Sequence, residues 1–274
     1  MRQKVIWLLC MAVLLLALSG IVVSRAQNKT DIIFGGMDGA YIHSDSYSVI
    51  DPNATPTPEV VEDDWPDIDI TQAQYRMVND DTENLLPSSF EPVCGIIDGT
   101  KFMMFDVDAL PYLNAMLHAA EDAGFTPYVS AAYRTYSYQT QMFNAKTSSI
   151  AWEMYGITDY MDPRYQEAAE RAKSITMYPG SSEHQLGLAV DIWDRQRNQN
   201  PGYDNMDQEF FAWLDAHCAE YGFIKRYPTR KLLLTGWDEP WHYRYIGIEA
   251  AKYIMDKGIC YEEFYKHYMP DFKY

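Results

Sequence analysis

The chain is short of positive charge. Lys and Arg number 22 against 39 Asp and Glu, which gives a formal net charge of −17 at pH 7. Such a charge repels phosphate backbones and anionic membrane surfaces, so it argues against nucleic-acid binding. Residues 27–70 hold ten acidic residues and a single basic one, Lys29. Because more than half of the net negative charge lies in that segment, the net charge is a poor guide to the substrate of the remaining chain.

Cysteine is also scarce, which excludes a dense disulfide framework. Of the four cysteines, Cys10 lies in an apolar run, and Cys94, Cys218 and Cys260 are left outside it. An oxidising exterior would permit one bridge among these three. The preferred pair is Cys218 with Cys260, because both sit in the C-terminal half next to helical patterns. The alternative is that all three are reduced and act as small hydrophobic residues.

An uncharged apolar run extends from Val5 to Val23, behind Arg2 and Lys4. It is long enough to span a bilayer as a helix, whereas the apolar part of a cleaved signal peptide is usually shorter. Small residues around Ser24 also offer a plausible cleavage position. We therefore interpret residues 1–26 as a membrane anchor, with a removed signal peptide as the alternative. The two basic residues ahead of the run predict that everything after it lies outside the cytoplasm.

The rest of the chain divides by composition. Residues 27–70 are acidic and contain the proline-rich stretch 51–59, so they are expected to form an extended, solvated stalk. Residues 71–274 have no internal repeat or low-complexity tract and are of ordinary size for a single domain.

Apolar periodicity predicts that helices and short strands segregate in this domain, which gives an α+β class with a small antiparallel sheet flanked by helices. The predicted helices are 107–123, 137–155, 162–175, 207–221, 247–256 and 261–267. The predicted strands are 126–132, 187–193, 223–227, 232–235 and 241–246.

Two groups of residues in this domain suggest chemistry. His184 stands at the mouth of a predicted apolar strand, and Asp191 lies in its interior. A carboxylate buried there must be paired, hydrogen-bonded or bound to a cation, because an unpaired buried charge costs several kcal/mol. Further along, Glu239 precedes His242 by three positions in an aromatic-rich stretch. Either group alone is weak evidence for a functional site.

Together the two groups offer two imidazoles and one carboxylate, from His184, Asp191 and His242. This set leaves the fourth tetrahedral position of Zn²⁺ for water, which is typical of a catalytic site rather than a closed structural one. Glu239 would then be the general base that takes a proton from the water and delivers it to the leaving amine.

The residues around these two groups resemble the sequence pattern of a known family. The pattern Ser182-x-His184-x-x-Gly187-x-Ala189-x-Asp191, followed by Glu239-x-Trp241-His242, is similar to the signature of the D-alanyl-D-alanine carboxypeptidases related to VanY, a family of zinc peptidases. The resemblance extends over most of residues 71–274 and includes three further stretches, 130–135, 221–228 and 235–240.

The resemblance implies a hedgehog/DD-peptidase-like fold and Zn²⁺ bound by His184, Asp191 and His242, with Glu239 as the catalytic base. It also implies that Arg134 stabilises the substrate carboxylate or carbonyl oxygen, a role that suits a bidentate guanidinium. Gln139 and Ser182 match positions associated with substrate contacts. Two alternatives stay open. His184, Asp191 and His242 could form a hydrogen-bonded core cluster without a metal, and Arg134 could form an ion pair that is only structural.

The expected activity is removal of a C-terminal D-alanine from peptidoglycan stem peptides by metal-activated water, at the extracytoplasmic face of a bacterial plasma membrane. Two other activities of the same metal site on the same polymer are alternatives: an L,D-carboxypeptidase and a cross-link endopeptidase. A non-catalytic, zinc-stabilised wall-binding module is disfavoured because Glu239 is present. The expected partners are stem peptides and, through the apolar run, the membrane, and the ectodomain is expected to be monomeric.

Overall fold

A computed structural model of the chain describes residues 64–195 and 208–273. The apolar run from Val5 to Val23 and nearly all of the expected stalk lie outside these ranges. Among the residues described, no helix combines the length and hydropathy of a membrane span.

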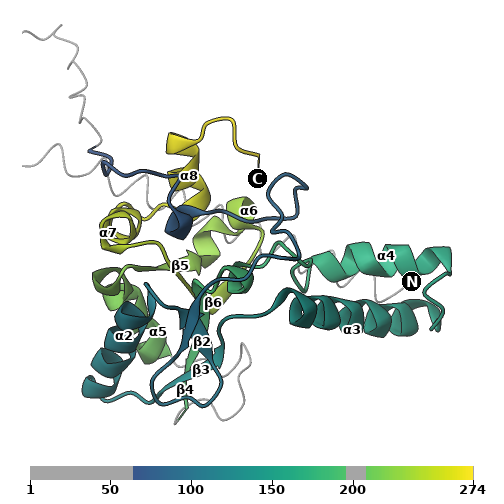
Figure 1. Ribbon diagram of the computed structural model, residues 1–274, viewed down its shortest axis with the longest axis horizontal. Helices are drawn as coiled ribbons and strands as arrows, with labels where there is room; N and C mark the ends of the chain where they lie inside the picture. Colours follow the sequence, from purple (N-terminus) through teal and green to yellow (C-terminus); the bar gives the residue numbers. More distant parts are fainter. Residues whose placement is uncertain (1–63, 196–207, 274) are drawn as a thin grey trace, which may run out of the picture. The chain divides into compact units, whose positions relative to one another are not determined.

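The centre of the fold is a four-stranded antiparallel sheet (Figure 1). Its strands, in spatial order, are β3 (Pro127–Ala131), β4 (Ala189–Asp194), β6 (Glu239–Tyr245) and β5 (Phe223–Tyr227). The register places Asp191 of β4 directly opposite His242 of β6. A separate two-stranded sheet joins β1 (Cys94–Ile96) to β2 (Met104–Asp106).

Helices pack around this sheet in three groups. The main apolar core joins the sheet to α2 (Leu110–Asp122) and α5 (Gln208–His217). A second core contains α7 (Ile248–Lys257) and α8 (Tyr261–Tyr268) together with residues of a short 3₁₀ turn, η1 (Ala73–Tyr75). The third group is a hairpin in which α3 (Tyr136–Tyr155) packs against α4 (Pro163–Lys173) and projects away from the sheet (Figure 1).

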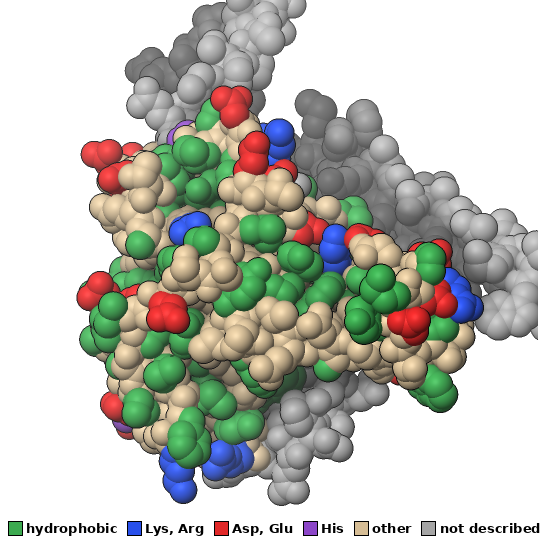
Figure 2. Space-filling view, turned by 45° about the vertical axis from the view of Figure 1, so that its right-hand side comes forward, with side chains coloured by type: hydrophobic (Ala, Val, Ile, Leu, Met, Phe, Trp, Pro, Cys, Tyr) green, Lys and Arg blue, Asp and Glu red, His purple; other side chains and the backbone are tan. Residues whose placement is uncertain are grey.

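Short helical turns complete the described chain: η2 (Glu183–Leu186), η4 (Cys218–Tyr221), η5 (Thr229–Lys231) and α6 (Leu232–Thr235). On the face seen in Figure 2, apolar side chains lie scattered among polar and charged ones. The predicted α+β class with a small antiparallel sheet is confirmed.

One predicted strand is wrong. Residues 232–235 form the helical turn α6 instead, with all three leucines on the surface. The reason lies in the pairing of the neighbouring strands: Tyr227 of β5 is opposite Glu239 of β6, so the residues between them must form the connection. Thr229 Oγ1 donates a hydrogen bond of 2.9 Å to Asp238 Oδ1 and closes the base of this loop.

The folded unit also begins earlier than the expected boundary at residue 71. Trp65, Ile68 and Ile70 pack against the second core, and the Trp65 ring stacks on His267 with ring centroids 3.9 Å apart. These apolar side chains draw the last part of the expected stalk into the folded unit because burying them removes apolar surface from water.

The preferred disulfide is wrong as well, because Cys94, Cys218 and Cys260 are all free thiols in the structure. Cys218 and Cys260 are buried, and this burial raises the pKa of each thiol to about 12. The alternative of reduced, small hydrophobic cysteines therefore describes the fold.

Candidate metal centre and active site

The site is built where η2, β4 and β6 meet. Pairing of β4 with β6 puts Asp191 and His242 side by side, since directly opposed residues have Cβ atoms about 4.5–5.5 Å apart. His184 reaches the same place from η2. Gly187 makes the turn between η2 and β4 with φ of 74°, and a Cβ atom there would lie 3.1 Å from the Cys94 sulfur. A glycine is thus needed to bring His184 back over the strand that carries Asp191.

The three predicted ligands form a buried cluster whose ligand atoms all lie within 4.8 Å of one another. Asp191 Oδ1 is 3.4 Å from His184 Nε2 and 3.1 Å from His242 Nδ1. The two imidazole planes are nearly perpendicular, at 89°. Two nitrogens and one carboxylate oxygen converging from different directions fit the donor set of a catalytic Zn²⁺ site, which keeps a fourth position open.

Hydrogen bonds outside the cluster fix which ring nitrogen faces the metal position. His184 Nδ1 donates to the carbonyl oxygen of Ala132 at 2.9 Å, which leaves Nε2 with its lone pair toward Asp191. On His242 the arrangement is reversed, since Nε2 lies 3.4 Å from Glu183 Oε2 and Nδ1 faces the cluster. Such outer contacts orient metal-binding imidazoles and raise their basicity.

Glu183 is the centre of a buried charge network. Arg226 Nε donates to Glu183 Oε1 at 2.8 Å, and Arg244 Nη1 lies 3.3 Å from the same oxygen. Arg226 also pairs with Glu262 at 2.7 Å. Although burial opposes ionisation, the two guanidinium groups hold the pKa of Glu183 well below its usual range. Arg226 and Arg244 are thus structural ion-pair partners of Glu183.

The pKa values of the three candidate ligands suit a cation. Burial works against the charge of Asp191, but the facing imidazoles outweigh it and keep its pKa well below the usual range. Burial lowers the pKa of His184, so this ring is neutral at pH 7. Burial opposes the charged form of His242 too, yet hydrogen bonds to Asp191 and Glu183 raise its pKa to about 9. A divalent cation would displace this last proton on binding.

Glu239 and Arg134 lie beside the cluster and line one cleft with it, with a volume of about 220 Å³. Glu239 Oε2 is 3.6 Å from His242 Nδ1, and burial raises the pKa of this carboxyl. Arg134 Nη2 is 3.6 Å from Asp191 Oδ2. The cleft thus joins a carboxylate able to accept a proton to a guanidinium able to hold an anion.

The two remaining candidates, Ser182 and Gln139, differ in their positions. Ser182 is buried and lines the cleft. Gln139 is fully buried and does not line it; its Oε1 accepts a hydrogen bond from Arg134 Nη1 at 3.5 Å, and its Nε2 donates to the Met177 carbonyl at 2.8 Å. Gln139 therefore positions Arg134 rather than facing the cleft.

Sequence reasoning missed the role of Glu183. Its only signal was a charge next to His184 in an apolar stretch, together with Arg226 and Arg244 in strands that are otherwise apolar. Buried charges of both signs need partners, so these residues could have been expected to meet.

The remaining histidines within the described chain stand away from the cluster: His118 and His217 pair with nearby carboxylates on the surface, and His267 stacks on Trp65.

The contact between Glu183 and His242 makes a prediction about metal affinity. Glu183→Gln should weaken Zn²⁺ binding about 10- to 100-fold, because it removes the charge that orients and strengthens the His242 ligand. Titration of the purified chain against a competing chelator measures this. Glu262→Gln is the matched control, since Glu262 contacts Arg226 and not His242. Equal Zn²⁺ affinity in the Glu183 variant and the control would contradict the assigned role, provided that circular dichroism shows both to be folded.

Comparison with known proteins agrees with this geometry. A family model described as "VanY: D-alanyl-D-alanine carboxypeptidase" matches residues 103–248, which is more than half of the chain. A D-alanyl-D-alanine carboxypeptidase of Enterococcus faecalis is 39% identical over 162 residues, covering 58% of this chain and 54% of the relative. The chain therefore spans about half the length of that relative.

Two solved structures are similar in fold. One is a mutant of the vancomycin resistance D,D-pentapeptidase VanY from a VanB-type resistance cassette, in complex with Zn(II). It has a TM-score of 0.56 and 34% identity, and the match covers 70% of this chain and 99% of that one. The other is the LD-carboxypeptidase LdcB, with a TM-score of 0.59 and 29% identity over 74% of this chain and 93% of its own.

Proposed function

The chain belongs to the VanY family of D-alanyl-D-alanine carboxypeptidases, and we propose from this premise that it removes the C-terminal D-alanine from peptidoglycan stem peptides. The observation that carries the proposal is the cleft itself. It brings the His184, Asp191 and His242 cluster, the Glu239 carboxylate and the Arg134 guanidinium to one place. A wall-binding module without activity would have no use for a buried carboxylate beside the metal position.

Each residue has a distinct task in this reaction. Zn²⁺, held by His184, Asp191 and His242, would supply polarisation of the scissile carbonyl and acidification of a water molecule. Glu239 accepts the proton of the attacking water and passes it to the leaving amine; its raised pKa favours holding that proton between the two steps. Arg134 binds the terminal carboxylate or the carbonyl oxygen of the peptide, and Gln139 holds Arg134 in position.

An L,D-carboxypeptidase that trims tetrapeptides is the second candidate. The observation that favours it is the similarity to LdcB, which is an LD-carboxypeptidase and matches this chain over a comparable length. Both activities would use the same metal, base and carboxylate-binding group. The D,D- and L,D-activities would therefore differ in which residue of the substrate fits beside the cleft.

We place this activity outside the cytoplasm, at the bacterial plasma membrane. The support is the apolar run Val5 to Val23 behind Arg2 and Lys4, which would anchor the chain as one span or direct its secretion if it is cleaved. A monomeric ectodomain is part of the same proposal.

Mass analysis of digested stem peptides tests the proposal. The zinc-loaded chain should release one D-alanine from a pentapeptide stem, and a chelator should abolish the release. Cleavage of the tetrapeptide alone would replace the D,D-activity by the L,D-activity. Zn²⁺ binding without cleavage of either stem would contradict the proposed carboxypeptidase.

A single substitution tests the role of Glu239. Glu239→Gln should keep the fold and bound Zn²⁺ yet lose activity by about 10²- to 10⁴-fold, because it removes only the proton acceptor. Glu249→Gln, which changes an exposed carboxylate on α7, is the control and should retain wild-type turnover. Wild-type turnover in the Glu239 variant would show that another group is the base.

A further inference from the structure

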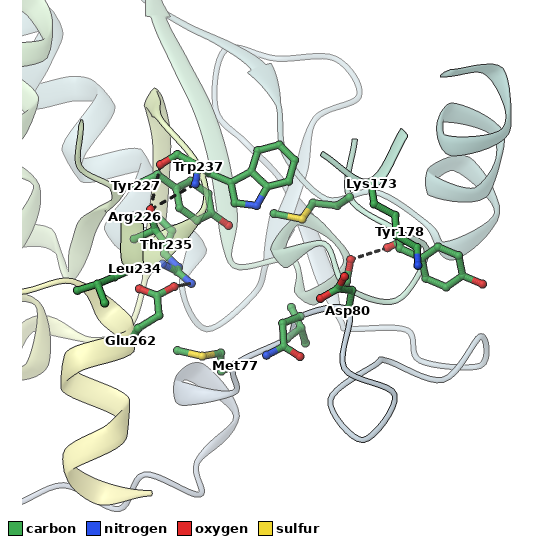
Figure 3. Close-up of a pocket in the computed structure, with 14 residues that line it drawn as sticks. Met77, Asp80, Lys173, Tyr178, Arg226, Tyr227, Leu234, Thr235, Trp237 and Glu262 are labelled. Atoms are coloured by element: carbon green, nitrogen blue, oxygen red, sulfur yellow. Dashed lines mark hydrogen bonds and ion pairs between the residues drawn. The ribbon is translucent and has the colours of Figure 1, made fainter. Parts of the chain in front are cut away.

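A groove with a volume of about 550 Å³ lies apart from the catalytic cleft and shares no lining residue with it. The chamber drawn in Figure 3 differs in this respect, because Tyr227 and Trp237 line both that chamber and the cleft. The chamber thus belongs to the site already described, whereas the groove is a separate feature. Its volume is larger than that of the cleft and lies in the range of about 300–1,000 Å³ that is usual for ligand sites.

The groove is formed by residues 98–103 between β1 and β2, four residues of α2, residues 126–129 at the start of β3, and Arg195 after β4. Two aromatic rings stand in it. Phe102 is 84% exposed, whereas Tyr128 is 37% exposed and has the guanidinium of Arg195 over its ring at 4.8 Å from the centroid. Phe102 is therefore the ring that presents a free face to a ligand.

The charged groups of the groove have no excess of either sign. The carboxylates of Asp98 and Glu121 both contact His118, at 3.6 Å and 3.1 Å. Lys101 and Arg195 add two positive charges to the same lining. A strongly charged ligand gains little from such a surface, whereas a neutral ligand that is rich in hydroxyl and amide groups finds both donors and acceptors.

The sheet connects this groove to the catalytic face. Tyr128 of β3 is directly opposite Trp193 of β4, and opposed residues project from the same face. Trp193 lies two residues from Asp191 on β4, so it shares the face of that metal ligand. The Trp193 ring stacks on Trp241, which lines the cleft, with centroids 4.8 Å apart. A row of aromatic side chains thus runs from the cleft toward the groove.

The distance between the two sites matches the length of a stem peptide. Ala131 of β3 is opposite Asp191, and Tyr128 lies three residues earlier, which is about 10 Å along the strand. An extended stem of four or five residues covers about 13–17 Å at the same rise. A stem whose carboxyl end lies at Arg134 is therefore long enough to leave its other end, where it is attached to a sugar, beside the groove.

An added peptide strand is the other kind of ligand that an edge strand can accept. β3 is at the edge of the four-stranded sheet, but its first residue, Pro127, has no N–H to donate to a further strand. The side chains of the groove, rather than the backbone of β3, therefore determine what binds.

We propose that this groove binds the glycan strand of peptidoglycan, with the C–H face of an N-acetylated amino sugar packed on Phe102 and its polar edge hydrogen-bonded to Asp98 and Glu121. The negative face of an aromatic ring attracts such C–H groups. The inference rests on the proposed peptidase function and adds a second attachment point for its substrate. Glycan-linked stems are then favoured over free ones, because binding of the sugar raises the effective concentration of the stem at the cleft.

Calorimetry with a peptide-free glycan tests the groove by itself. The full chain in a sugar-free detergent should bind a tetramer of β-1,4-linked N-acetylglucosamine in a saturable way. Phe102→Ala should weaken this binding about five- to tenfold, which is the loss expected for one stacking contact. Because Phe102 is exposed, the substitution should leave the fold intact.

Tyr160→Ala is the matched control, since Tyr160 is an aromatic residue that is 76% exposed and does not line the groove. It should bind the tetramer as tightly as the wild-type chain. Absence of saturable binding, or equal affinity of the wild-type chain and Phe102→Ala, would overturn the proposal.

Kinetics with two substrates tests the link between the groove and cleavage. One substrate is a pentapeptide stem attached to a glycan oligomer, and the other is the same stem without the glycan. Phe102→Ala should lower kcat/KM for the glycan-linked stem about five- to tenfold and leave kcat/KM for the free stem unchanged. An equal loss for both substrates would show that Phe102 acts on the cleft and not through the glycan.

The binding measurement requires no cleavage, so the groove and the proposed activity are tested separately. Tetramer binding that depends on Phe102 supports the groove even if the chain cleaves neither stem. Rapid cleavage by a chain that does not bind the tetramer overturns the groove and leaves the proposed activity in place.

Discussion

The antiparallel pairing of β4 with β6 is the constraint on which the site depends. It sets Asp191 opposite His242, and every other functional group is positioned relative to that pair. Because β-strand side chains alternate between faces, a shift of one residue in this register would turn Asp191 and His242 to opposite faces of the sheet. The two strands lie in the middle of the sheet, with β3 and β5 on either side, so the register is held by hydrogen bonds on both edges of each strand.

The buried charges behind the ligands extend this constraint into the second core. Glu183 contacts His242 with one oxygen and two arginines with the other, and Arg244 in turn donates to the carbonyl oxygens of Gln74 and Arg76. A carboxylate this deeply buried is stable only while its partners are in place, since loss of one partner leaves an uncompensated charge. The network thereby ties the metal position to the segment that precedes β1, a part of the chain distant in sequence.

The sequence was most informative where chemistry demands particular residue types at short spacing. The His184 and Asp191 group, the Glu239 and His242 group and Arg134 were all identified, and the structure brings them into one cleft. Helices and central strands were also predicted, because their apolar periodicity persists over many residues. The three-residue strands β1 and β2 are too short to give such a pattern.

Features that depend on contacts between residues distant in the sequence could not be predicted from the sequence pattern. Leu232 to Thr235 resembles a strand by composition, but the pairing of β5 with β6 makes it a connecting turn. Gln139 was assigned to the substrate, whereas its buried amide holds Arg134. Trp65 and Ile68 stand in an acidic segment, and only α8 and its neighbours give them a core to join.

The proposed chemistry depends on one Zn²⁺ bound by residues from η2, β4 and β6, and anomalous diffraction at the zinc edge from crystals of the zinc-loaded chain would locate this ion. We expect a single peak bonded to His184 Nε2, Asp191 and His242 Nδ1, at about 2.0–2.2 Å, with a further position open to solvent. A peak elsewhere, or coordination through His242 Nε2 in place of Nδ1, would contradict the arrangement of ligands and outer contacts described above.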